Sequence, residues 1–387
     1  MMQQDTRLST SCGSPTQANY DPGETNSIAL KPEATVTAAS LRGEEFRNDL
    51  RAPGARNAQA RQALSAQELL PFTQLDDLRS LLAIAQSGLL LIGAGALIVG
   101  LWGSPWMLVG IALMGLAQHS LFILSHEAAH YRLLSHRGAN DALGRLIGMS
   151  SGVSMCTYRV THRLHHNNLY TSEDPDTAIH GGYPRGKAYL LRKLAQDIVG
   201  WNAWKTYAYF FGAPAINEDT QRAIRPLDDT SPQLRKAARQ DRYLVVGAHI
   251  TMPLLAFVGG GLHGLALYCV VWIVPLMTAL QPILRLRAVC EHGAVSDLSS
   301  PLTAARSNRT FGSWSNRLLG ALLFPHHVNY HLEHHLYPAV PHYHLPALHR
   351  ALQSRGVLEG AEVRDLPDTL RMIFAPRKPK AAGVVHV

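Results

Sequence analysis

Histidine is abundant in this 387-residue chain, and the spacing of eight of its 20 histidines indicates metal chemistry. Three short motifs contain them: HEAAH at 126–130, HRLHH at 162–166 and HLEHH at 331–335. Side chains three or four positions apart lie on one face of a helix, so each motif would direct at least two imidazoles toward a common point. The eight residues are His126, His130, His162, His165, His166, His331, His334 and His335.

Eight imidazoles are more ligands than one tetrahedral zinc ion takes, whereas they suit two first-row metal ions. A single motif of this kind is common without a metal, but three together in one chain are a specific signal. The elements that carry the motifs must therefore bring residues far apart in the sequence to one place.

Four uncharged apolar segments indicate that these elements belong to an all-α integral membrane protein. They cover residues 81–101, 106–124, 243–260 and 264–283. Each has about 20 residues, enough to cross a hydrocarbon core of roughly 30 Å. Very short turns join the first pair and the second pair. We therefore expect two transmembrane hairpins, capped by a cytoplasmic helical domain that holds a histidine-rich di-metal site.

The charge distribution orients the four spans. None of the 36 Lys and Arg residues falls in either outer turn, so the positive-inside rule places both termini and the segment between the hairpins in the cytoplasm. An even number of spans separates the motifs, and all three then reach the same membrane face. The net charge of +8 would face anionic lipid headgroups. Because basic and acidic residues are interspersed, we expect no nucleic-acid partner.

Two further segments are expected near the membrane surface. Residues 142–155 are apolar but too short to span, and they contain Arg145, so we expect a re-entrant or interfacial helix capped by Asp141. Residues 189–211 combine apolar residues at helical spacing with basic ones. That pattern fits either an interfacial helix or a helix packed on the cytoplasmic domain.

The ends of the chain differ in composition from its centre. Residues 1–70 are polar and contain Gly and Pro breakers, which predicts a disordered cytoplasmic N-terminal tail. The membrane domain is expected to cover residues 71–350, and residues 351–387 are expected to form a cytoplasmic C-terminal tail. The four cysteines form no C-x-x-C pair, so they indicate neither a disulfide framework nor a thiolate metal site.

A location at the bilayer suggests that the metal centre acts on lipid. An unactivated C–H bond of a lipid chain is beyond general acid or base chemistry and requires a metal-bound oxidant derived from oxygen, which favours iron. HEAAH, HRLHH and NYHLEHHLYP, together with two hairpins, resemble the membrane-bound fatty acid desaturases. This superfamily of integral di-iron enzymes also includes hydroxylases and carotenoid ketolases. The resemblance covers residues 81–350.

The resemblance implies an O2-dependent desaturase that takes two hydrogens from an acyl-lipid chain, with two electrons from a separate donor. It makes the eight motif histidines iron ligands. His292, in RLRAVCEHG, looks like the additional histidine that these enzymes place before the last motif. A helix-terminal histidine interacting with the helix dipole is the alternative interpretation of His292.

Carboxylates near the motifs are suited to accept hydrogen bonds from the outer ring nitrogens and so to fix the imidazole tautomers. Asn329 could hold a metal-bound water, or it could form a turn. The carboxylates in question are Glu127, Asp174, Asp176, Glu291 and Glu333.

Other functions fit parts of the pattern. HEAAH matches the H-E-x-x-H motif of zinc proteases, with Glu127 as general base, but a membrane metallopeptidase would leave two motifs unused. A metal carrier without redox catalysis would be expected to place its ligands within the spans. Hydroxylation or ketolation would replace desaturation in a related enzyme. The sequence has no HPGG haem segment, flavin motif or iron–sulfur cysteines, so electrons are expected from an external ferredoxin- or cytochrome-type carrier.

Overall fold

The computed structural model describes residues 62–171, 173–216, 223–228, 230–298 and 300–376. Most of the tail predicted at residues 1–70 therefore lies outside the described residues, as do residues 377–387 of the tail predicted at 351–387. Within the described chain, α3 (Ala66–Thr73) precedes the first predicted span. Ser65 and Glu68 form a capping box at its start.

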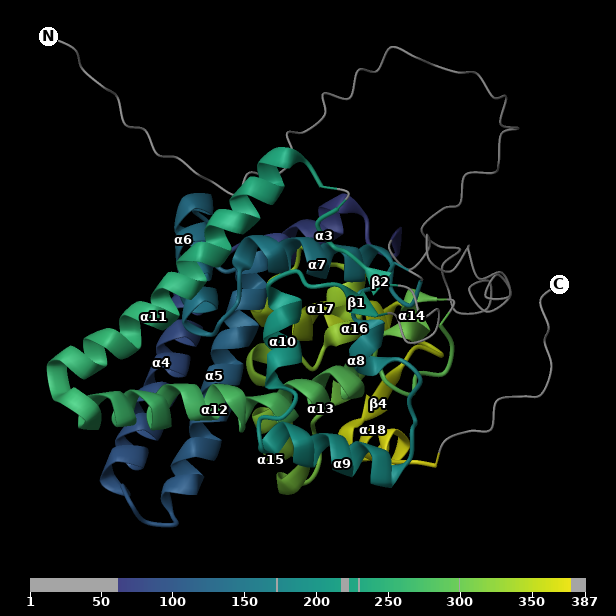
Figure 1. Cartoon of the computed structure of the whole chain (residues 1–387). Coiled ribbons are helices and arrows are strands. Elements are labelled where there is room, and N and C mark those ends of the chain that lie inside the picture. Colours follow the sequence, from purple (N-terminus) through teal and green to yellow (C-terminus); the bar gives the residue numbers. More distant parts are fainter. Residues whose placement is uncertain (1–61, 172, 217–222, 229, 299, 377–387) are drawn as a thin grey trace, which may run out of the picture.

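α4 (Asp77–Gly100) and α5 (Met107–Ala129) form an antiparallel hairpin, close to the spans predicted at 81–101 and 106–124 (Figure 1). The carboxylate of Asp76 begins α4 by accepting the backbone N–H groups of residues 78 and 79. α5 continues past residue 124 to Ala129, so most of the HEAAH motif lies on the spanning helix itself.

The second predicted hairpin is one long helical run with a break. It comprises α11 (Pro232–Tyr268), the π-helical η1 (Cys269–Ile273), α12 (Val274–Met277) and α13 (Leu280–His292). Gly261 interrupts α11 with φ 59° and ψ −146°, a left-handed φ that glycine adopts without strain. The chain turns sharply between α11 and α12, at the lower left of Figure 1. The break falls between the spans predicted at 243–260 and 264–283.

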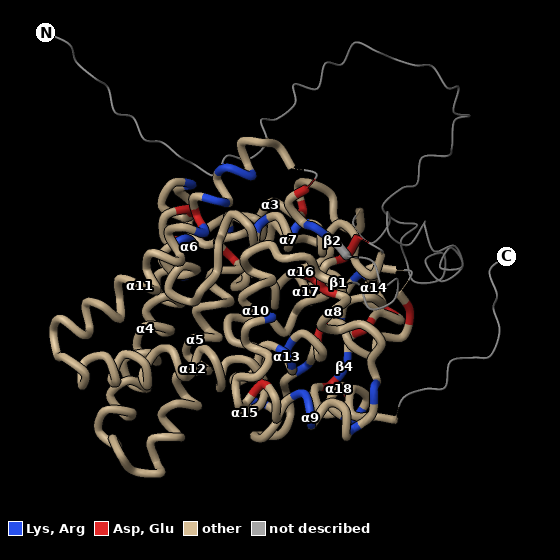
Figure 2. The backbone as a smooth tube through the Cα atoms, viewed as in Figure 1, with Lys and Arg blue, Asp and Glu red and all other residues tan. Residues whose placement is uncertain are grey.

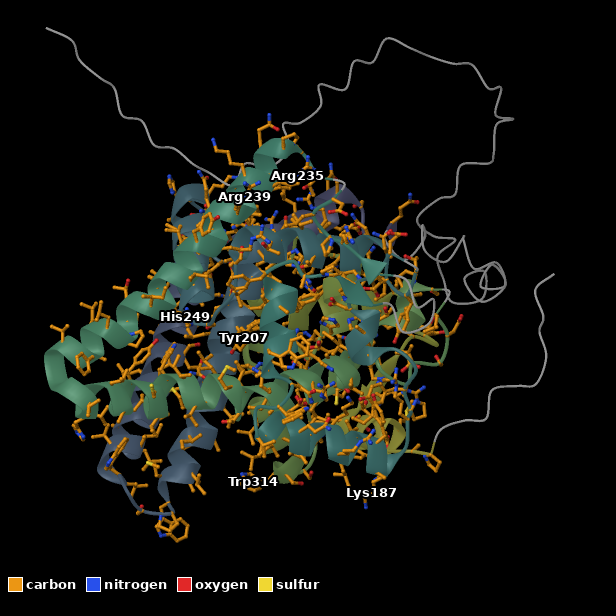
Figure 3. All side chains as sticks on the ribbon, in the orientation of Figure 1. Lys187, Tyr207, Arg235, Arg239, His249 and Trp314 are labelled. Carbon is orange, nitrogen blue, oxygen red and sulfur yellow. The ribbon has the colours of Figure 1, made fainter. Side chains whose placement is uncertain are left out.

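Three helical runs in the described part of the chain are long and apolar enough to cross a membrane: Asp77–Gly100, Met107–Ala129 and Pro232–His292. Their surfaces suit lipid, because large apolar side chains such as Ile92 and Val258 are 70% and 74% exposed. Figure 2 shows that charged residues are missing from the end of the molecule where α4 meets α5 and crowd its other side. Figure 3 places Arg235 and Arg239 at the opposite end of α11 from its break.

The segment between α5 and α11 folds into helices that cover one end of the hairpin. These are α6 (Arg137–Ser150), α7 (Met155–Asn167), α8 (Thr177–His180), α9 (Lys187–Ile198) and α10 (Ala203–Phe210). A short antiparallel pair, β1 (Ala215–Ile216) and β2 (Ala223–Ile224), follows them.

The chain after α13 folds back onto the same end of the hairpin. Its helices are α14 (Pro301–Ala304), α15 (Trp314–Leu323), the 3-10 turns η2 (Pro325–His327) and η3 (His342–His344), α16 (His331–Leu336), α17 (Leu345–Ser354) and α18 (Leu366–Ile373). β3 (Ser307–Arg309) pairs in parallel with β4 (Val363–Asp365). The described helices and strands thus continue past residue 350, where the sequence places the start of a tail.

Two local predictions need correction. α6 begins at Arg137, with His136 as its N-cap, rather than after Asp141. Asp141 lies inside the helix, where its carboxylate pairs with Arg145 at 2.9 Å and with Arg159. The carboxylate of Asp141, which was predicted to cap the helix, therefore links α6 to α7 through Arg159.

The segment 189–211 is two helices rather than one. Gly200, at φ +77°, separates α9 from α10. The Tyr207 hydroxyl on α10 donates to the carbonyl of Leu276 on α12, while Trp201 and Trp204 remain exposed. One side of α10 is therefore packed on the spanning run, and the neighbouring tryptophans face outward.

Candidate metal centre

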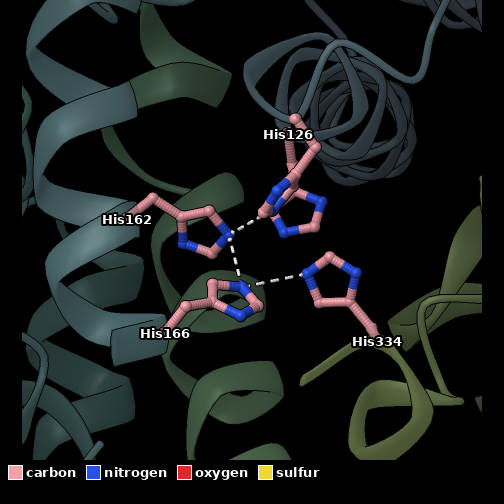
Figure 4. A group of neighbouring side chains, drawn as sticks. His126, His162, His166 and His334 are labelled. Carbon is pink, nitrogen blue, oxygen red and sulfur yellow. Dashed lines mark hydrogen bonds between the residues drawn. The ribbon is translucent and has the colours of Figure 1, made fainter. Parts of the chain in front are cut away.

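All nine histidines predicted as ligands meet in two adjacent groups. His126, His130, His162, His166 and His334 form the five-histidine cluster, and His165, His292, His331 and His335 form the four-histidine cluster. In each cluster the potential ligand atoms lie within 4.8 Å of one another. Figure 4 shows the rings of His126, His162, His166 and His334 converging on one point.

Four helices supply these nine side chains. α5 and its C-cap give His126 and His130, and His292 ends α13. α7 and α16 each serve both clusters, because residues one position apart in an i, i+3, i+4 motif leave a helix in different directions. On α7, for example, His166 joins the five-histidine cluster and His165 joins the four-histidine cluster.

A buried carboxylate fixes the start of α7. Asp241, on α11, accepts the Ser154 hydroxyl at 2.9 Å and the backbone N–H of Cys156 at 3.0 Å. Ser154 is the N-cap of α7. The long apolar run therefore holds the helix that carries the central histidine motif.

A buried arginine fixes the end of α13. The guanidinium of Arg306 is fully buried, donates to the carbonyls of Cys290 and Gly293, and pairs with Glu362 at 2.9 Å. It satisfies carbonyl groups that a helix leaves free at its C-terminus. His292 is thereby placed by contacts that include residues beyond the predicted domain boundary.

The distances between imidazoles fit metal coordination. Nε2 of His292 lies 3.2 Å from Nε2 of His165 and 2.8 Å from Nε2 of His331. In the five-histidine cluster, Nε2 of His162 lies 2.9 Å from that of His130 and 3.0 Å from that of His166. With metal–nitrogen bonds of about 2.1 Å, two ligands at right angles are about 3.0 Å apart.

Two of these residues direct their Nε2 atoms toward each other, because their Nδ1 atoms are hydrogen-bonded elsewhere. The Nδ1–H of His165 donates to Asp174 Oδ1 at 2.9 Å, and the Nδ1–H of His292 donates to the carbonyl of Ala304 at 3.2 Å. In their neutral forms, both rings therefore direct an Nε2 lone pair at the other. Two facing lone pairs repel each other, whereas both can bind one metal ion.

Burial favours the neutral form, which can bind a metal ion, in most of these nine histidines. Eight of the nine histidines are at least nine-tenths buried, and His130 is half-buried. Burial, assisted by neighbouring imidazoles, holds the pKa of His162, His166, His331, His334 and His335 well below its ordinary value. His165 differs: burial also lowers its pKa, but the carboxylates of Asp174 and Asp176 outweigh burial and raise the pKa to about 9.

Four of the six residues predicted to support the ligands lie beside them. Asp174 contacts His165 directly, and an Asp176 oxygen lies 3.6 Å from the same nitrogen. Glu127 and Glu291 each have an oxygen 3.7 Å from Nδ1 of His126 and His331, respectively. Glu127 also accepts the backbone N–H of His342, and Glu291 accepts from Arg287.

The other two have different partners. Asn329 donates to the carbonyl of Asn308, which ties the chain before α16 to β3. Glu333 bonds to Ser307 and His349 instead of a cluster histidine. Both residues therefore hold α16 in position through neighbouring segments. Their spacing in the sequence does not distinguish this structural role from direct support of a cluster histidine.

Sequence reasoning missed His180. It ends α8 and is 1% exposed, with its ring centroid 4.8 Å from that of His292. His165, Asp174 and His180 form a third group of potential ligand atoms within 4.8 Å of one another. The sequence feature that could have identified His180 is its position at the end of the short segment that follows Asp174 and Asp176.

A cavity of about 520 Å³ reaches the clusters. Its wall includes His162, His165 and His331 from both clusters. Apolar and aromatic residues, among them Phe122, Tyr158, Phe210 and Leu284, also line it, together with charged residues such as Lys193, Lys205 and Arg285. A concave site that combines apolar side chains with polar groups can hold a small molecule.

The sequence matches the fatty acid desaturase family over residues 82–365, and the chain belongs to this family. Its helical, membrane-like architecture and its buried histidine clusters agree with an oxidoreductase that holds a metal centre at a membrane.

Several relatives are desaturases of different substrates. A dihydrorhizobitoxine desaturase from Bradyrhizobium elkanii is 28% identical over 267 residues, 67% of this chain and 69% of that protein. An acyl-lipid (9+3)-(E)-desaturase from Dimorphotheca sinuata is 24% identical over 263 residues, 62% of this chain and 64% of the relative. A bifunctional desaturase/conjugase from Vernicia fordii is 22% identical over 274 residues, 65% of each chain.

Proposed function

We propose that this protein is an O2-dependent acyl-lipid desaturase that introduces a double bond into an acyl chain at a di-iron centre. The observation that carries the proposal is the pair of adjacent, buried histidine clusters at the end of an apolar helical hairpin, with a cavity leading to them. The family match supports a desaturase-type reaction.

Each cluster would hold one iron ion, the five-histidine cluster one and the four-histidine cluster the other. When bound, the two ions supply the O2-derived oxidising power that breaking an unactivated C–H bond requires. The carboxylate of Asp174 accepts the Nδ1–H of His165 and so keeps the Nε2 lone pair of that ring directed toward the ion.

The acyl chain would lie in the cavity that reaches both clusters. Aromatic and aliphatic side chains of its wall, such as Phe122, Phe210 and Leu284, would hold the chain against the ligand histidines. Lys193 and Lys205 near the cavity would suit an anionic headgroup or carrier on the substrate.

The membrane arrangement that we propose has four spans, with α11 and the run from η1 to α13 forming the second hairpin around Gly261. Both termini and the metal centre would be cytoplasmic. The lack of Lys and Arg in the two outer turns supports this orientation. An external carrier of ferredoxin or cytochrome type would dock on the basic cytoplasmic face to deliver electrons.

The metallopeptidase alternative is disfavoured by the surroundings of Glu127. A general base must reach a metal-bound water, but Glu127 Oε2 accepts the backbone N–H of His342 at 2.9 Å. The two HEAAH histidines also share their cluster with three more imidazoles, whereas a catalytic zinc has three protein ligands and an open position.

Lipid analysis of a host that expresses the chain tests the proposal. We expect a new unsaturated acyl species, detected by mass spectrometry, that is absent from the host without the chain and from cells expressing the His165→Ala variant. A hydroxylated lipid or an altered carotenoid in place of the alkene would assign the chain to a related di-iron reaction. Unchanged lipids with full iron loading would contradict an acyl-lipid substrate.

A further inference from the structure

His180 is a buried histidine that the nine-ligand arrangement does not use. Its ring lies between those of His292 and Tyr170, with centroid distances of 4.8 and 4.9 Å. Nε2 of His180 is 3.9 Å from Asp174 Oδ2, beyond hydrogen-bonding distance. The residue therefore touches the four-histidine cluster without being bonded to it.

Neither ring nitrogen of His180 has a hydrogen-bond partner, although the side chain is 1% exposed. Burying an unpaired polar group costs free energy, and buried polar groups in native proteins nearly always have partners. A residue needed only to fill this space would be better served by an apolar side chain of similar size. The two unpaired nitrogens therefore indicate that this ring binds a group other than the protein itself.

The clusters beside His180 are unequal. One offers five imidazoles and the other offers four, and His180 lies against the smaller cluster. Its potential ligand atom is within 4.8 Å of those of His165 and Asp174. Turning the ring toward the cluster would break no hydrogen bond, because it has none.

We propose that His180 is a tenth histidine of the metal centre and supplies a ligand, directly or through one bound water, to the ion of the four-histidine cluster. This inference rests on the proposed di-metal centre. It gives the two ions equal numbers of imidazole ligands. It also places one of these ligands on α8, at the wall of the substrate cavity, since His180 borders that cavity.

Two variants separate a ligand from a space-filling residue. His180→Phe keeps the ring-sized volume and removes both nitrogens, whereas His180→Gln keeps a polar atom that can still bind a metal. His249→Phe, on α11, is the matched control, because His249 bonds to the backbone carbonyl of Val245 away from the clusters. Figure 3 shows His249 on the outer helix.

The experiment uses the full chain in detergent, loaded anaerobically with ⁵⁷Fe(II) and then challenged with a chelator. Metal content per chain and the Mössbauer spectrum are measured. In His180→Phe we expect one of the two ions to bind about 10- to 100-fold more weakly and one quadrupole doublet to change, with the other unchanged. His180→Gln should retain more of that ion, and His249→Phe should match the unmodified chain.

Wild-type metal retention and spectra in His180→Phe would overturn the proposal, and so would equal loss of both ions in that variant. The unmodified chain separates this inference from the proposed function. Fewer than two ions in the unmodified chain would contradict the di-iron centre itself, whatever the variants do.

Discussion

His166 and His335 stack face to face, with ring centroids 4.2 Å apart and planes 18° from parallel, although they belong to different clusters. His166 comes from α7 and His335 from α16, 169 positions later in the numbering. The two clusters therefore share a wall made of one imidazole ring from each.

His165→Ala removes one proposed ligand from the four-histidine cluster and the partner of Asp174. We expect product formation to fall by about 100-fold or more, because loss of even an outer-shell partner costs 10- to 100-fold in metal affinity or activity. Lipid profiling and iron content measure the effect. The variant should stay in the membrane fraction at the wild-type level, and normal product formation would show that His165 is not a ligand.

Asp174→Asn preserves the shape of the side chain and removes the charge that holds the Nδ1–H of His165. We expect about 10- to 100-fold weaker retention of one iron ion. A chelator titration followed by metal analysis measures it. Asp368→Asn, at an exposed position on α18, is the control and should bind iron normally. Equal retention by both variants would refute an orienting role for Asp174.

The dependence of stability on pH should include a contribution from Glu362. Burial raises the pKa of Glu362, but bonds from Arg364, Ser296 and Arg306 outweigh it and lower the pKa from 4.5 to about 2. A carboxyl whose pKa is lower in the folded state stabilises the fold above its unfolded pKa. That contribution, of order 3 kcal/mol at most, should be lost as the pH falls from about 4.5 toward 2.

Thermal unfolding in detergent across this pH range tests the role of Glu362. Glu362→Gln should unfold at a lower temperature than the unmodified protein near neutral pH, and the difference should shrink as the solution is acidified. Glu359→Gln, at an exposed position nearby, serves as control. A difference that does not depend on pH would exclude ionisation of Glu362 as its cause.

Gly115 should be intolerant of any side chain. A Cβ there would lie 2.6 Å from Cβ of Ala279 and 2.9 Å from its backbone carbonyl carbon, so backbone would have to move. We expect Gly115→Ala to destabilise the protein by about 1–3 kcal/mol, as overpacking does. Gly93→Ala on α4 meets nothing within 4 Å and should be neutral or stabilising. Similar unfolding temperatures for the two variants would contradict close packing of α5 on the helical run Pro232–His292.

The sequence predicted the features that depend on local periodicity and composition. The first two spans lie within a few residues of α4 and α5, because an uncharged apolar run of that length has few other stable forms. The histidine motifs were recognisable because their i, i+3, i+4 spacing is itself a helical pattern. Asp174 was expected beside a motif histidine and lies within hydrogen-bonding distance of His165, while its role in supporting a ligand stays a prediction.

Features that depend on partners far away in the sequence were not predictable. Asp141 looked like a cap because nothing nearby indicates that its partner Arg159 lies on the next helix. Glu333 resembled a support for a neighbouring histidine, yet it bonds to Ser307 and His349. His180 stands outside every spaced motif, and only the fold brings it to His292.

The division of α7 and α16 between the two clusters has a consequence for how the enzyme is loaded. The first ion to bind would immobilise both helices, and with them proposed ligands for the second ion. Binding of one ion should therefore favour binding of the other in the unmodified chain, while a variant that lacks a ligand for one ion still binds the other. A host short of iron would hold more complete centres, and fewer half-filled ones, than two independent sites would give.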